Sequence, residues 1–229
     1  MTGKWRKTFS LYGGLSIFKN KVEQAEIMIN DVLRNYNKPY IAFSGGKDST
    51  CMLHLILEQN PDIMVLYWDY GKYYIPRKIN CEIKENAKKL GAKNLRVETS
   101  IKYEKLKRQA KNILGEDLIK GLLPRLKDER YDASFIGLRK EESLKRKIRI
   151  QAGRSLSEIK EIFPIADWTW MDVWAYIISN HLPYLSHYDL YGPIIGWNKV
   201  RMTTFFDPEF DKYGCSNIDG VLMWKYRIK

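Results

Sequence analysis

The segment Ser44-Gly45-Gly46-Lys47-Asp48-Ser49 has the residue types of a phosphate-binding loop, and it follows an apolar stretch at 40–43. Two successive glycines allow backbone conformations that a side chain would forbid, so several N–H groups can turn inward around an anion. A helix that begins near Ser49 would point its positive end at the same place. Lys47 adds a mobile positive charge, and the serine hydroxyls are hydrogen-bond donors. The loop is therefore the expected contact with a phosphate.

The spacing of this loop separates it from two common nucleotide-binding motifs, because it is neither G-x-x-x-x-G-K-[ST] nor G-x-G-x-x-G. It resembles instead the pyrophosphatase loop of ATP-dependent enzymes that cleave between the α and β phosphates, releasing pyrophosphate and leaving an adenylate. The alternative is an ordinary turn between a strand and a helix, with a serine or aspartate as N-cap. The match over the whole loop, in a strand-loop-helix context, argues against that alternative.

A second segment, residues 135–146, repeats the pattern of a strand, a glycine and charged residues that open a helix. In an open doubly wound sheet, ligands bind beyond the carboxyl ends of the strands, where the strand order reverses. If the two strands are neighbours across that reversal, Arg139 and Lys47 face the same crevice. We then expect Gly137 and Arg139 to bind the ligand, with a bidentate contact from Arg139 to phosphate oxygens. Arg146 would lie one or two helical turns further along.

A third segment, residues 164–177, continues to Leu182-Pro183-Tyr184. Together the three segments are similar to the phosphoadenosine phosphosulfate (PAPS) reductase family, within the adenine-nucleotide alpha-hydrolase superfamily, over about residues 40–196. Asp69-Tyr70-Gly71 also resembles the family's Asp-Thr-Gly turn. The resemblance implies an α/β fold with the nucleotide near this turn, so Asp69 and Gly71 become candidate contacts.

Two features depart from the reductases of this family. Their phosphate loop lacks the Gly-Gly-Lys-Asp arrangement, because they do not cleave ATP, and they share a cysteine in a Glu-Cys-Gly-His-like motif near the C-terminus. Here the late cysteine is Cys215, within Tyr213-Gly214-Cys215-Ser216-Asn217. Sulfur-transfer relatives often carry paired cysteines, whereas Trp197 stands here where many relatives have a Gly-Cys pair. These differences favour ATP over a sulfonucleotide as the ligand.

The elements that must position these residues alternate between helix and strand, which is typical of a parallel sheet covered on both faces. The predicted fold is α/β, a doubly wound, mainly parallel five-stranded sheet with an irregular C-terminal segment. Residues 1–38 are predicted as a helical lead-in, 39–182 as the nucleotide-binding domain and 183–229 as an irregular segment packed on it. The pattern predicts strands at 40–43, 63–67, 95–98, 133–136 and 162–165, helices at 19–36, 49–58, 76–90 and 170–179, and two short basic helices within 102–127.

Composition restricts the class of protein. Hydrophobic residues make up 45% of the chain, which is enough for a buried core at this length. There is no run of 18 apolar residues and no signal-peptide core after the basic N-terminus, so we expect a cytoplasmic protein that does not enter a membrane. The three cysteines form no Cys-x-x-Cys pair, so neither an iron–sulfur cluster nor a structural zinc site is expected.

The net charge of +12 is unevenly distributed, because residues 102–154 contain 16 Lys or Arg and 8 Asp or Glu. Such an excess favours a polyanionic partner, either an adenine nucleotide or a nucleic acid. The alternative is a solvated helix face. A protein that donates or accepts sulfur, and a homo-oligomer, are further partners that the sequence leaves open.

The leading hypothesis from the sequence is an ATP pyrophosphatase that transfers AMP to an acceptor and releases pyrophosphate. Arg139 would stabilise charge at the α-phosphate, and Asp48 would position Mg²⁺ directly or through water. The first alternative is a sulfonucleotide reductase with Cys215 as nucleophile, and the second is a non-catalytic nucleotide-binding subunit of a nucleic-acid-modifying complex. The predicted catalytic residues are Lys47, Arg139 and Arg146, and the predicted ligands of ATP are Phe43, Ser44, Gly45, Gly46, Lys47, Asp48, Ser49, Asp69, Gly71, Gly137 and Arg139.

Overall fold

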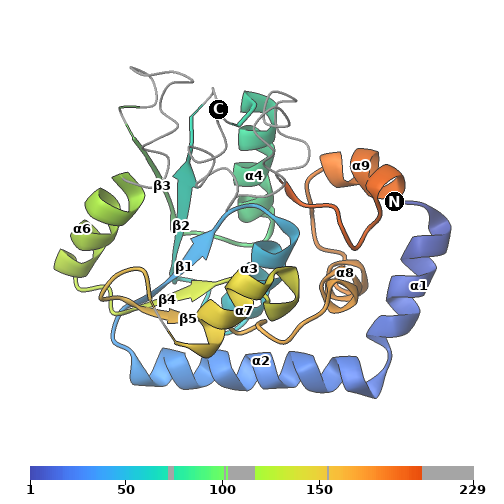
Figure 1. Ribbon diagram of the computed structural model, residues 1–229, viewed down its shortest axis with the longest axis horizontal. Helices are drawn as coiled ribbons and strands as arrows, with labels where there is room; N and C mark the ends of the chain where they lie inside the picture. Colours follow the sequence, from blue (N-terminus) through green and yellow to red (C-terminus); the bar gives the residue numbers. More distant parts are fainter. Residues whose placement is uncertain (72–74, 101, 103–116, 154, 203–229) are drawn as a thin grey trace.

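Parallel strands form one five-stranded sheet in the order β3-β2-β1-β4-β5 (Figure 1). This computed structural model describes residues 1–71, 75–100, 102, 117–153 and 155–202. The strands are β1 Pro39–Phe43, β2 Met64–Asp69, β3 Leu95–Thr99, β4 Ala133–Ile136 and β5 Lys160–Ile162. The predicted α/β fold with a parallel five-stranded sheet is confirmed, and the strand order reverses between β1 and β4.

The last strand differs from its prediction at 162–165, because β5 spans Lys160–Ile162. Pro164 follows it, and proline has no N–H group to donate to a neighbouring strand. Ile165 and Ala166 are buried in the turn that follows. Their hydrophobicity therefore reflects packing rather than strand structure.

Helices connect the strands and also precede and follow the sheet. The N-terminal lead-in consists of two helices, and the two basic helices predicted within 102–127 lie largely outside the described residues. The helices are α1 Gly3–Gly13, α2 Ser16–Asn35, α3 Lys47–Leu57, α4 Arg77–Lys89, η2 Asp117–Leu122 (a π-helix), α6 Leu123–Asp128, η3 Lys140–Glu142 (a 3-10 turn), α7 Leu144–Gln151, α8 Trp170–Ser179 and α9 His187–Ile195.

Helix α9 lies in a stretch that was predicted to be irregular. Gly192 and Pro193 interrupt its helical sequence pattern, although the helix continues to Ile195. The remainder of that predicted segment, 203–229, lies outside the described residues. The C-terminal part of the chain therefore contributes at least one helix near the sheet.

The topology divides the helices between the two faces of the sheet. Crossover connections between parallel strands are right-handed, so the reversal between β1 and β4 places α3 and α4 on one face and α6 and α7 on the other. Successive residues of a strand point to opposite faces, so Ile41 and Tyr40 face different layers. Helix α3 is buried along nearly its whole length and packs against both β1 and α8.

Helix α8 begins with the capping box that Thr169 and Asp172 predict. Asp172 N–H donates to the Thr169 hydroxyl at 3.3 Å, and Thr169 N–H donates to the Asp172 carboxylate at 2.6 Å. The same buried carboxylate accepts from Lys21 of α2 at 2.6 Å and from the Tyr12 hydroxyl of α1 at 3.0 Å. One aspartate thus joins both N-terminal helices to α8.

Aromatic side chains fill the space between α1 and α8. Phe9 stacks on Trp174 with ring centroids 6.2 Å apart, and it meets Trp170 edge-on at 6.1 Å. Trp168 and Trp174 are buried, so they serve packing. Within the described part of the chain, no helix combines the length and apolar character needed to cross a membrane.

Candidate functional site

Residues 44–49 connect β1 to α3, and α3 begins at Lys47. Gly45 has a φ of +80°, and a Cβ atom there would lie 2.5 Å from Ile83 of α4, so both backbone and space require glycine. The Ser44 and Ser49 hydroxyl oxygens are 3.0 Å apart, and the Ser49 hydroxyl donates to the Gly46 carbonyl at 2.9 Å. These bonds hold the loop at the N-terminus of α3, where the first helical N–H groups have no partner within the helix.

The end of β4 lies directly against this loop because of Gly137. A Cβ atom on Gly137 would lie 3.0 Å from the backbone nitrogen and Cα of Ser49. Backbone atoms in the first turn of a helix cannot move aside as a flexible side chain can. The absence of a side chain at Gly137 therefore lets the two strand ends meet, and it brings the segment after β4 to the phosphate loop.

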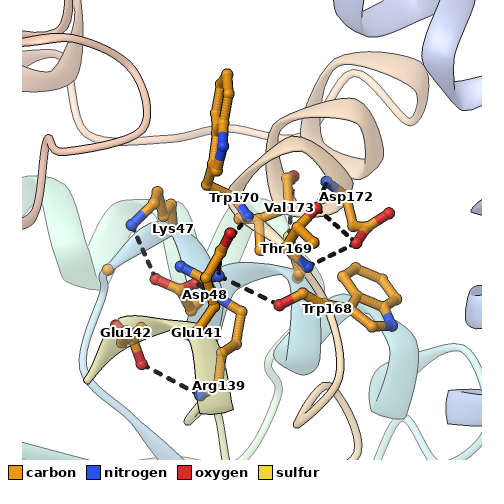
Figure 2. Close-up of polar contacts among 12 residues, drawn as sticks. Lys47, Asp48, Arg139, Glu141, Glu142, Trp168, Thr169, Trp170, Asp172 and Val173 are labelled. Atoms are coloured by element: carbon orange, nitrogen blue, oxygen red, sulfur yellow. Dashed lines mark hydrogen bonds and ion pairs between the residues drawn. The ribbon is translucent and has the colours of Figure 1, made fainter. Parts of the chain in front are cut away.

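Asp48 and Arg139 form a buried ion pair between these two segments (Figure 2). Arg139 Nε donates to Asp48 Oδ1, and Lys47 Nζ lies 3.1 Å from Asp48 Oδ2. Arg139 Nη1 also donates to the Glu141 carboxylate at 2.6 Å and to the Trp168 carbonyl at 3.2 Å. Burial alone would raise the pKa of Asp48, but the two cations hold that pKa below its usual range. Asp48 is therefore ionised and offsets part of the positive charge of Lys47 and Arg139.

The arrangement of Asp48 does not fit direct coordination of the Mg²⁺ ion that the sequence suggests it would position. One of its oxygens accepts from Arg139, and the other faces Lys47 at 3.1 Å. Mg²⁺ needs ligand oxygens at about 2.0–2.1 Å in octahedral geometry. A metal ion at this carboxylate would have to displace one of the two side chains, so Asp48 acts here as a counter-ion.

Arg146 belongs to a second buried ion pair, with Glu142. Arg146 Nη1 pairs with Glu142 Oε1, and Arg139 N–H donates to Glu142 Oε2 at 3.1 Å. Arg201 approaches from the C-terminal side and donates to the Glu142 carbonyl at 2.8 Å. Since Glu142, Arg146 and Arg201 all line the same cavity, a second group of charges faces the ligand space, in which one carboxylate offsets part of the charge of two arginines.

Tyr188 of α9 reaches the phosphate loop. Its hydroxyl accepts from the Lys47 N–H at 3.1 Å, and its ring packs edge-on against Trp174 at 5.3 Å. The start of α9 is held by Ser186, whose N–H and hydroxyl donate to the Glu82 carboxylate at 2.6 and 3.0 Å. Burial raises the pKa of Tyr188, so the phenol stays protonated. The C-terminal part of the chain therefore contributes directly to the loop.

A cavity of about 290 Å³ extends from the loop along the face of the sheet that carries Tyr40. Three polar residues, Tyr40, Ser134 and Glu161, lie on neighbouring strands and contribute to its lining. The remaining walls are largely apolar, and a base or other planar group fits such surroundings. The principal apolar wall residues are Leu66, Trp68, Leu118, Leu123, Ile136 and Leu156.

The structure places most predicted site residues around this cavity. Asp69 and Gly71 instead support the turn after β2: Asp69 accepts from Gly71 N–H at 2.7 Å and from Arg77 at 2.9 Å. Their neighbours Trp68 and Tyr70 line the cavity. The predicted residues in the lining are Phe43, Ser44, Gly46, Lys47, Asp48, Ser49, Gly137 and Arg146, whereas Gly45, Arg139, Asp69 and Gly71 lie outside it.

Sequence reasoning missed Tyr188 and the three polar residues of the sheet face. Tyr40 and Ser134 could have been found from the alternation of residues in β1 and β4, since each shares a face with the residue two positions on. Glu161 was not considered because it lies one residue before the strand that the sequence predicts at 162–165. Tyr188 had no comparable signal because the pattern of α9 is interrupted.

The cysteines in the described part of the chain do not line the cavity. Cys51 is buried in α3, where its thiol donates to the Val173 carbonyl at 3.4 Å and burial raises its pKa. Cys81 is exposed on α4. Cys215, the candidate nucleophile, lies outside the described residues.

Comparison with known proteins identifies relatives over most of the chain. An adenosine 5′-phosphosulfate reductase of Bacillus mycoides is 30% identical over 174 residues, which are 70% of this chain and 72% of the relative. The enzyme of the same name from Bacillus cereus is 28% identical over 198 residues, 80% of this chain and 82% of the relative. An uncharacterized protein of Methanocaldococcus jannaschii is 31% identical over 76% of this chain, which corresponds to 38% of its own length.

A solved structure has the same fold. The phosphate complex of PAPS reductase from Candida auris matches 73% of this chain and 84% of its own, with a TM-score of 0.53 and 18% identity. The phosphoadenosine phosphosulfate reductase domain model matches residues 38–218, which include both loops and all five strands. This chain therefore belongs to the phosphoadenosine phosphosulfate reductase family.

Proposed function

We propose that this chain is a sulfonucleotide reductase that acts on adenosine 5′-phosphosulfate. The observation that carries the proposal is the charge balance around the phosphate loop. Asp48 pairs with Lys47 and Arg139, and Glu142 lies against Arg146 and a further arginine, so these two carboxylates offset half of the charge of the four cations. A site whose cations are already paired with carboxylates suits a nucleotide with one phosphate and one sulfate better than it suits a triphosphate.

The curated relatives support the same substrate. Two that cover most of the chain, from Bacillus mycoides and Bacillus cereus, carry the name adenosine 5′-phosphosulfate reductase. The loop alone had favoured ATP. With the charge balance and these relatives considered together, the reductase becomes the better supported of the two functions.

The reaction requires a thiolate nucleophile, and Cys215 is the candidate. In the proposed first step, Cys215 Sγ attacks the sulfur of the sulfate group, the S–O bond to the α-phosphate breaks, and AMP leaves with the electron pair on its phosphate oxygen. Lys47 and the first N–H groups of α3 would stabilise that charge. A dithiol reductant then attacks Cys215 Sγ, which releases sulfite, and its second thiol restores the cysteine while the dithiol becomes a disulfide.

Release of sulfite tests the proposal. Purified protein, incubated with adenosine 5′-phosphosulfate that is radiolabelled in its sulfate group and with a dithiol, is expected to form labelled sulfite and AMP. Cys215→Ser should abolish sulfite release. Cys81→Ser, on the exposed surface of α4, is the matched control and should retain it. Failure of the wild-type protein to release sulfite, with small dithiols and with a protein dithiol, would contradict the proposal.

One observation favours a second candidate, an ATP pyrophosphatase. The loop at 44–49 has the residues of the ATP-type loop, including Lys47 at the start of α3. That reaction would break the bond between the α and β phosphates, transfer AMP to an acceptor and release pyrophosphate. Pyrophosphate formed from ATP by the wild-type protein and not by Lys47→Met, without sulfite formation from the sulfonucleotide, would establish this candidate instead.

A further inference from the structure

Helix α4 supports the phosphate loop directly through Ile83. This side chain is fully buried, and a Cβ atom on Gly45 would lie 2.5 Å from it. Gly45 has a φ of +80°, so the chain turns at the point where Ile83 packs against it. The position of the loop is therefore set partly by α4.

The preceding residue of α4, Glu82, holds a different element. Its carboxylate accepts hydrogen bonds from the Ser186 N–H at 2.6 Å and from the Ser186 hydroxyl at 3.0 Å. Ser186 immediately precedes α9 and does not cap that helix with its side chain. A backbone donor and a side-chain donor of one residue, bound to one carboxylate, fix both the position and the direction of the chain there. Glu82 therefore anchors the start of α9 on α4.

Tyr188, two residues after Ser186, extends from α9 to the loop. Its hydroxyl accepts a hydrogen bond from the Lys47 N–H at 3.1 Å, and its side chain is 1% exposed. The ring is rigid and is packed against Trp174, so the hydroxyl moves with the backbone of α9. Hydrogen bonds of this kind have N···O distances up to about 3.2 Å, so a displacement of about 0.5 Å away from the loop would weaken this one.

One helix thus positions both partners of the hydrogen bond between Tyr188 and the loop. Helix α4 holds the loop through Ile83 and holds α9 through Glu82. Asp189, also in the first turn of α9, binds the Tyr184 hydroxyl and the amino group of Met1, neither of which belongs to α4. Glu82 is not among the residues that line the cavity, so any effect on a ligand must pass through α9.

We infer that Glu82 is a positioning residue for phosphate binding. By holding Ser186, it keeps the Tyr188 hydroxyl on the Lys47 N–H and so fixes the loop at the start of α3. The inference rests on the proposed function, because it takes AMP as a product that the site binds.

A double-mutant cycle with Glu82→Ala and Tyr188→Phe tests this inference, with the dissociation constant of AMP measured by titration calorimetry on the full chain. Glu82→Ala alone should raise this constant about fivefold, because both hydrogen bonds to Ser186 are lost. In the Tyr188→Phe background, the same change should have less than about a twofold effect, since the hydroxyl that Glu82 positions is already absent. Glu85→Ala, at an exposed position of the same helix, is the control and should bind AMP as the wild-type protein does.

The dependence on background separates positioning from a purely structural role. If Glu82 contributed only to the stability of the fold, Glu82→Ala would weaken AMP binding equally in both backgrounds or in neither, and either result would overturn the inference. Should Glu82→Ala not fold, Ser186→Ala removes the hydroxyl bond alone and should raise the dissociation constant about twofold. An unchanged constant in Ser186→Ala would then contradict the inference.

The same measurements keep this inference distinct from the proposed function. If the wild-type protein binds AMP and the cycle gives one of the contrary results, the inference fails and the proposed function stands. Failure of the wild-type protein to bind either AMP or adenosine 5′-phosphosulfate would overturn both.

Discussion

Asp48 and Arg139 are 91 residues apart in the chain, yet their side chains form the buried ion pair that joins the phosphate loop to the segment after β4. The pair spans the point where the strand order reverses, between β1 and β4. Ligands of doubly wound sheets bind at this point. The ion pair therefore fixes the relative position of the two halves of the candidate site.

The first prediction concerns the charge of Asp48. Asp48→Asn leaves Lys47 and Arg139 without their counter-ion, and breaking a buried ion pair costs roughly 3–5 kcal/mol. We expect the free energy of unfolding at pH 7 to fall by about 3 kcal/mol, as measured by urea denaturation. Asp167→Asn breaks the pair with Lys140, in which Asp167 is 76% exposed, and should cost less than about 1 kcal/mol.

The same variant predicts a pH dependence. The folded-state pKa of Asp48 is depressed below that of an unfolded aspartate, about 3.9. Its contribution to stability is therefore complete above about pH 4 and is lost as the pH falls toward the folded-state pKa. The difference in stability between the wild-type protein and Asp48→Asn should stay constant from pH 7 to about pH 5 and shrink as the pH falls below about 4. A difference that does not shrink below about pH 4 would show that the charge of Asp48 does not stabilise the fold.

The second prediction concerns the close approach at Gly137. Gly137→Ala places a Cβ atom 3.0 Å from the backbone of Ser49, so either β4 or α3 must shift. Overpacking of this kind costs about 1–3 kcal/mol, and nucleotide binding should weaken as well. Gly121→Ala is the control, because its Cβ would meet nothing within 4 Å. Equal stability of the two variants would mean that the approach is not tight.

The third prediction concerns Tyr188. Tyr188→Phe keeps the ring on Trp174 but leaves the Lys47 N–H without its acceptor, so the loop loses one fixed point. We expect a five- to tenfold rise in the dissociation constant for AMP, consistent with the loss of one hydrogen bond of about 1 kcal/mol. Tyr184→Phe is a matched control, since its ring also meets Trp174, at 5.4 Å, while its hydroxyl binds Asp189. Similar losses in both variants would assign the effect to packing.

The parts of the site at the strand ends were predictable because each carries a local signal. Gly45 and Gly137 mark positions where the backbone must turn or approach another segment, and both do so in the structure. Alternating strands and helices imply a doubly wound sheet but do not say which strands flank the reversal, and the strand order shows that β1 and β4 do. To predict the pairing of Asp48 with Arg139, one needs that adjacency as well as the two motifs.

The parts contributed by surrounding elements were not predictable in the same way. Glu161 was missed because the apolar residues around Pro164 led to a predicted strand at 162–165, whereas β5 spans Lys160–Ile162. Tyr188 was missed because Gly192 and Pro193 hide the helical pattern of α9. In both cases tertiary packing, rather than local sequence preference, decides where the side chain lies.

The proposal that the cavity binds a sulfonucleotide is tested most directly by equilibrium binding. Titration calorimetry of the purified full chain with adenosine 5′-phosphosulfate and with ATP, each in the presence of Mg²⁺, compares the two ligands on the same protein. We predict that adenosine 5′-phosphosulfate binds at least tenfold more tightly than ATP, because Asp48 and Glu142 already offset part of the positive charge at the site. Tighter binding of ATP than of adenosine 5′-phosphosulfate would contradict the proposal.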